Sequence, residues 1–118
     1  MSRFAFHVGL AALAAGLCIG PGAALAASAE KGKIAYMQFG CWGCHGMVGQ
    51  GGVTGPKLAP DPIPYEAFVA FTRTTNRAMP PYREAVLSNE DLADIYAYVQ
   101  SIPKPSDHKS IPLLNLLP

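Results

Sequence analysis

The sequence Cys41-Trp42-Gly43-Cys44-His45 decides how the rest of this chain is interpreted. Two thiols stand three positions apart, and an imidazole follows directly. This spacing is typical of covalent haem attachment, because thiols so placed can form thioethers to the two vinyl groups of one haem. The histidine is then held on one face of the ring, where it can ligate the iron. The motif therefore predicts Cys41, Cys44 and His45 as haem-binding residues.

Other sites built on Cys-x-x-Cys fit this chain less well. A thioredoxin-like dithiol needs strands and a helix around the motif, and the sequence has no alternating strand pattern. A structural zinc site needs four ligands; the motif supplies three, and His108 lies far away in a polar tail. A disulfide across two intervening residues would close a loop too short to stabilise the fold much.

Residues 1–27 are predicted to be a signal peptide. Arg3 precedes an uncharged apolar run, and Ala-x-Ala triplets close at Ala26 and at Ala29. This order is typical of a secretory leader, and we expect cleavage between about 26 and 29. The apolar run is shorter than the ~20 residues that a spanning helix needs. The leader therefore predicts a periplasmic protein with no permanent membrane span.

The composition of the remaining chain is nearly neutral and poor in core residues. The 118 residues include nine Lys and Arg and eight Asp and Glu, and the leader carries Arg3. Such a balance excludes the basic surface of a nucleic-acid binder. All but one of the 11 prolines follow the leader, and few large apolar residues do. A single domain this small often depends on a cofactor for its core.

Helical periodicity is the only regular pattern in the mature chain. Ser88 is a candidate N-cap, and apolar residues follow at helical spacing, which predicts a helix over 89–101. Two more helices are predicted, over 64–75 and 29–39. In the last of these, Gly32 would allow another helix to approach closely. The segment 46–62 is rich in glycine and proline and is predicted to be a loop.

A second axial ligand is expected from a methionine. Met47 follows His45 too closely to reach the opposite side of the ring, and Met37 lies in a predicted helix, where a packing role is expected. Met79 precedes Pro80-Pro81, which favours an extended backbone able to place the thioether across the haem. Ligation by His45 and Met79 would leave no open site for a substrate, which favours electron transfer over catalysis.

These pieces occur in the order found in class I c-type cytochromes, and the mature chain resembles that family over nearly its whole length. The matching residues are Gly32, Tyr36, the Cys41–His45 motif, Gly55-Pro56-Lys57-Leu58, Met79-Pro80 and the stretch 95–99 with Tyr98. The resemblance implies that the Pro56 carbonyl accepts a hydrogen bond from His45. It also implies a small all-α cytochrome c fold of three to four helices around one covalent haem c, spanning 28–103. The prolines of the tail separately predict an extended or poorly ordered arm over 104–118.

The function that the resemblance implies is that of a periplasmic one-electron carrier and not an enzyme. Its partners would be a periplasmic dehydrogenase as donor and a terminal oxidase or similar acceptor. The alternative is a fixed cytochrome c subunit of a periplasmic alcohol, aldehyde or sugar dehydrogenase complex, for which the apolar end of the arm would be a docking element. A gas-binding or catalytic haem protein is a third class, against which Met79 argues.

The sequence does not decide the roles of four further side chains. Trp42 could pack on the haem rim or lie at a partner surface. Arg73, Arg77 and Tyr82 are candidates for hydrogen bonds to the haem propionates.

Overall fold

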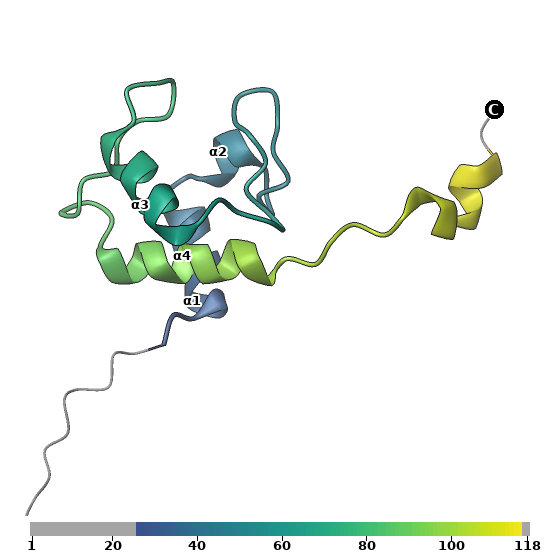
Figure 1. Cartoon of the computed structure of the whole chain (residues 1–118), viewed down its shortest axis with the longest axis horizontal. Helices are drawn as coiled ribbons and strands as arrows, with labels where there is room; N and C mark the ends of the chain where they lie inside the picture. Colours follow the sequence, from purple (N-terminus) through teal and green to yellow (C-terminus); the bar gives the residue numbers. More distant parts are fainter. Residues whose placement is uncertain (1–25, 117–118) are drawn as a thin grey trace, which may run out of the picture.

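The structure is a computed structural model that describes residues 26–116. The regular elements of this part of the chain are all helices, and it contains no strand (Figure 1). The predicted leader, apart from its last two residues, lies outside the described residues. The all-α fold class is confirmed. The elements are α1 (Ala29–Gln38), α2 (Trp42–His45), α3 (Tyr65–Thr74), α4 (Asn89–Ser101) and two 3₁₀ helices, η1 (His108–Ser110) and η2 (Pro112–Leu116).

Helix α4 has the bounds that its sequence predicts. The Ser88 hydroxyl accepts a hydrogen bond from the Asp91 backbone N–H at 3.0 Å, which satisfies a donor left free in the first turn. Leu92, Ile95 and Val99 are almost completely buried. This apolar face is what attaches α4 to the rest of the domain.

Helix α1 crosses α4 at Gly32 (Figure 1). A Cβ at position 32 would fall on the backbone carbonyl of Asp94 and would lie 2.9 Å from the backbone nitrogen of Ile95. The expected close approach is therefore confirmed, and α4 is the helix that makes it. Tyr36 and Tyr98 complete the crossing with an edge-to-face contact, their ring centroids 5.4 Å apart.

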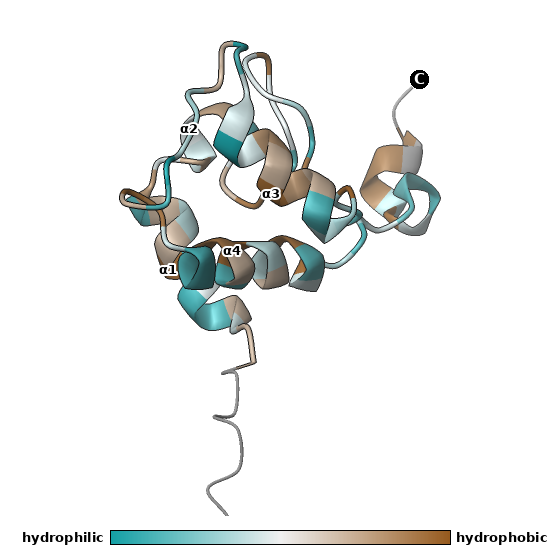
Figure 2. Ribbon diagram, turned by 60° about the vertical axis from the view of Figure 1, so that its left-hand side comes forward, coloured by the Kyte–Doolittle hydropathy of each residue, from teal (hydrophilic) through white to brown (hydrophobic). Residues whose placement is uncertain are grey.

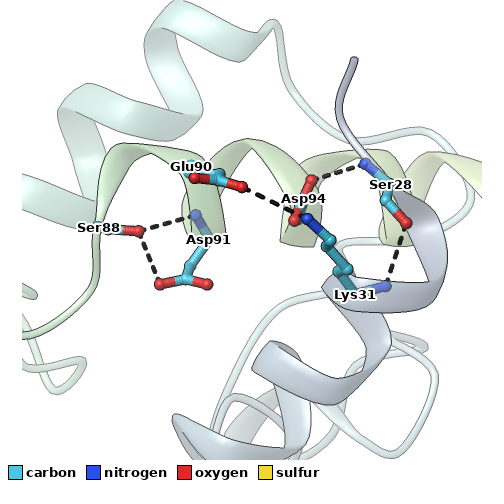
Figure 3. A network of polar contacts seen from close by, with 6 residues as sticks. All are labelled: Ser28, Lys31, Ser88, Glu90, Asp91 and Asp94. Atoms are coloured by element: carbon cyan, nitrogen blue, oxygen red, sulfur yellow. Dashed lines mark hydrogen bonds and ion pairs between the residues drawn. The ribbon is translucent and has the colours of Figure 1, made fainter. Parts of the chain in front are cut away.

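Polar contacts join the start of α1 to α4 (Figure 3). The Ser28 backbone N–H donates to Oδ1 of the buried Asp94 at 2.6 Å. The Ser28 hydroxyl in turn accepts from the Lys31 backbone N–H at 3.3 Å and so caps α1. Lys31 and Glu90 form an exposed ion pair at 3.5 Å. Ser28 is therefore both the N-cap of α1 and its polar link to α4.

Helix α3 lies on the other side of α4, and Figure 2 shows hydrophobic colouring on both where they face each other. Phe68 and Thr72 are its buried residues, and Phe68 packs against Tyr96 of α4, with ring centroids 5.3 Å apart. The helix predicted over 64–75 is confirmed to within a residue at each end. Pro64 stands at the N-cap and not in the first turn.

The chain beyond α4 leaves the helical domain as an arm (Figure 1). Residues 103–107 have no regular structure, and η1 and η2 follow. The arm is thus helical in two short turns and not extended throughout. Leu113 and Leu116 are 73% and 78% exposed. Within residues 26–116, no helix has the length and apolar character that crossing a membrane requires.

Candidate haem site

The last four residues of the Cys-x-x-Cys-His motif form the short helix α2, which is separated from α1 by residues 39–41. Cys41 is its N-cap residue, and the Cys41 backbone N–H donates to the Tyr36 carbonyl at 3.1 Å. His45 is the last residue of α2 and is 7% exposed. Cys41 is half-buried, whereas Cys44 is exposed. Sequence analysis missed this helix, because four residues are too few to show a helical period.

The imidazole of His45 is held by the loop that follows α2. Its Nδ1 lies 2.8 Å from the Pro56 carbonyl oxygen, so the contact implied by the family resemblance is present. Gly55 makes this possible, since a Cβ there would lie 2.7 Å from the Cys44 carbonyl oxygen and 3.0 Å from Nδ1 of His45. With Nδ1 donating to a carbonyl, the neutral ring has its lone pair on Nε2. No residue in 26–116 makes a hydrogen bond to Nε2.

A cavity of about 270 Å³ opens between the motif helix, α3 and α4. Both His45 and Met79 line it, and Cys41 lies at its wall. The remaining wall is mainly apolar, formed among others by Leu58, Phe68, Leu87, Leu92 and Ile95. An apolar cavity with an imidazole, a thioether and a thiol on its wall fits a haem, which needs apolar surroundings and soft or nitrogen axial ligands. Cys44 is not part of the wall.

Only one of the three methionines of residues 26–116 lies at the cavity. Met79 is half-buried and lines it. Met37 and Met47 are 36% and 53% exposed, and neither contributes to the wall. The expectation that Met37 packs in the interior is wrong, because it lies on the solvent side of α1.

The thiol of Cys41 has no tendency to ionise at neutral pH. Burial raises its pKa to about 11. Redox-active Cys-x-x-Cys pairs instead have a thiol with a lowered pKa, since the thiolate is the reacting species. The environment of Cys41 is therefore unlike that of a thioredoxin-like dithiol.

Comparison with known protein families agrees with this geometry. The family model described as cytochrome C oxidase, cbb3-type, subunit III matches residues 27–99. The chain belongs to this family of cytochrome c domains. Searches of curated proteins and of solved structures gave no match. Membership in a cytochrome c family implies a covalently bound haem c and a role in haem-based electron transfer.

Of the three residues proposed to bind the haem propionates in this cytochrome c domain, Arg73 and Tyr82 bind protein carbonyls instead. Arg73 donates through Nη1 to the carbonyls of Tyr82 and Leu87, both at 2.7 Å, and does not line the cavity, which disfavours a propionate role for it. Tyr82 lines the cavity, but its hydroxyl donates to the Phe39 carbonyl at 2.9 Å. Arg77 is exposed and does not line the cavity.

Trp42, whose role the sequence left open, lies on the surface of the cytochrome c domain. It is 45% exposed and is not part of the cavity wall. The structure therefore favours a surface position over packing on the haem rim.

Proposed function

We propose that this chain is a periplasmic one-electron carrier in which haem c is attached through Cys41 and Cys44 and ligated by His45 and Met79. The observation that carries the proposal is the cavity, whose wall includes both His45 and Met79. When bound, haem supplies the one-electron redox chemistry. Two protein ligands on one iron leave no coordination position for a substrate, which supports a carrier and not an enzyme.

Each residue has a distinct task in this proposal. The Pro56 carbonyl fixes the ring and the tautomer of His45, and such a partner also raises the basicity of a ligating imidazole. Met79 provides a neutral thioether, which favours a higher reduction potential than a second histidine would. The apolar wall limits the access of water, which also tunes the potential.

The proposed donor is a periplasmic dehydrogenase and the proposed acceptor a terminal oxidase or similar protein. The matching family takes its name from a subunit of a terminal oxidase, which supports an acceptor of that kind. The alternative, a fixed subunit of a periplasmic dehydrogenase complex, is supported by the arm. The exposed side chains of Leu113 and Leu116 have the apolar character of a docking element.

Covalent attachment is tested on the protein purified from a host that matures c-type cytochromes. The haem is expected to remain with the polypeptide through acid–acetone extraction and denaturing electrophoresis. Changing Cys41 and Cys44 together to Ala should release it, while Met79→Ala should leave it attached. Haem that is extracted from the unmodified protein would contradict the proposal.

A further inference from the structure

The segment that carries Met79 has few attachments of its own. It runs from the end of α3 to the start of α4, over residues 75–88. Between Ala78 and Pro81, no backbone hydrogen bond to another residue of 26–116 is present, and Pro80 and Pro81 have no N–H to donate. The position of Met79 therefore depends on the bonds at the two ends of a short loop.

One cation closes that loop. Nη1 of Arg73, in the last turn of α3, donates to the carbonyl oxygens of Tyr82 and Leu87, and Nη2 donates to Oδ1 of Asn89 at 2.8 Å. Asn89 is itself fixed by a bond from its Nδ2 to Glu84 at 2.7 Å. The planar guanidinium suits this task, because its donors point in fixed directions and remain charged.

Tyr82 is the residue at which the loop is fastened. Its backbone N–H donates to the Thr72 carbonyl at 2.9 Å, and its carbonyl accepts from Arg73. Its hydroxyl reaches the Phe39 carbonyl at the C-cap of α1, two residues before Cys41. The loop is therefore tied on one side to α3 and on the other to the segment that leads into the motif.

We propose that Arg73 is a positioning residue that holds the Met79 loop closed and thereby keeps the Met79 thioether on the iron. Tyr82 is the second residue that holds this loop in place. The inference rests on the proposed ligation by Met79 and adds the residues that maintain it. Without the Arg73 bonds, residues 76–81 would be held, besides their chain ends, by the bond of the Arg77 backbone N–H to the Thr75 hydroxyl and by the bonds of Tyr82 to Thr72 and Phe39. The fraction of molecules with Met79 detached should therefore rise.

Competition by imidazole measures this fraction in the haem-loaded ferric protein. An external ligand binds only molecules whose Met79 is detached, so its apparent dissociation constant falls in proportion as that fraction grows. Loss of the near-infrared sulfur-to-iron band is the readout. For Arg73→Met we expect the apparent constant to fall about tenfold or more, which converts to about 1.4 kcal/mol. Arg73→Lys should lie between this variant and the unmodified protein.

Arg83→Met is the matched control. Arg83 lies in the same segment and is exposed, and its side chain makes no hydrogen bond within residues 26–116. This variant should bind imidazole as the unmodified protein does. If Arg73→Met does not fold, Tyr82→Phe provides the second test, because it removes only the bond to the Phe39 carbonyl. We expect a fall of about threefold in its apparent constant.

The outcomes separate the inference from the function on which it rests. A near-infrared band in the unmodified protein that Met79→Ala removes would support the ligation. If imidazole then binds the Arg73 and Tyr82 variants no more tightly than the control, the positioning role is refuted and the ligation stands. An unmodified protein without the band would overturn the ligation by Met79 and the positioning role with it.

Discussion

Replacing Gly32 by Ala should destabilise the domain, although alanine favours helices. A Cβ at this position would meet the backbone of Asp94 and Ile95 in α4. Backbone atoms cannot turn aside as a side chain does, so the two helices must separate. Overpacking of this kind typically lowers the free energy of unfolding by about 1–3 kcal/mol, and we expect a loss near the upper end of this range when two helices must move apart. The higher helix propensity of Ala offsets up to about 1 kcal/mol of this loss.

We therefore expect a net loss of about 2 kcal/mol in the free energy of unfolding. For a domain of this size, this corresponds to a fall in Tm of roughly 8–16 °C. The assay is denaturant and thermal unfolding of the haem-loaded protein, followed by circular dichroism. Gly43→Ala is the control, because a Cβ at Gly43 meets no protein atom within 4 Å beyond its chain neighbours and the backbone of its own helix. Its stability should be unchanged or slightly higher. A Gly32→Ala protein as stable as the unmodified one would refute the description of the crossing.

Further expectations follow from other contacts. The mature protein should begin at Ala27 and not at Glu30, because cleavage after Ala29 would remove the N-cap Ser28 and its bond to Asp94. Intact-mass analysis distinguishes the two start points. Ser28→Ala should lower the free energy of unfolding by about 1 kcal/mol. Burial raises the pKa of Tyr36. The contribution of its neutral hydroxyl to stability is therefore complete below the unfolded tyrosine pKa of about 10 and is lost as the pH rises above that value. Between pH 8 and 11, the free energy of unfolding should decline less in Tyr36→Phe than in the unmodified protein. Deleting residues 109–118 should leave the haem spectrum and the Tm unchanged, and a large fall in Tm would show that the arm packs on the domain; association with a partner enzyme should weaken if the arm docks there.

Local signals in the sequence were enough to predict α1, α3 and α4, but not the short motif helix α2. The capping serine and apolar period of 89–101 gave α4 its bounds, since both features act within a few residues. Gly32 was identifiable as a close-approach position, because glycine is unfavourable inside a helix unless something requires it. The contact between His45 and Pro56 came only from the resemblance, because no local rule relates residues that far apart in a loop.

The roles of side chains in the tertiary structure were harder to predict. Arg73 looked like a ligand for a haem propionate, but the partners of a guanidinium depend on which carbonyls the folded chain brings near it. Those carbonyls belong to a segment whose path no periodicity defines. Met37 looked like a packing residue, because the weak periodicity of α1 does not distinguish its buried face from its exposed one.

The near-infrared absorption of the ferric protein tests the central claim most directly. With His45 and Met79 bound to one iron, the oxidised protein should show the weak band of sulfur-to-iron charge transfer. Met79→Ala should abolish the band and open a site for carbon monoxide, with the haem still covalently attached. Met37→Leu and Met47→Leu should keep the band. A band that survives Met79→Ala, or an unmodified ferrous protein that binds carbon monoxide avidly, would contradict the account.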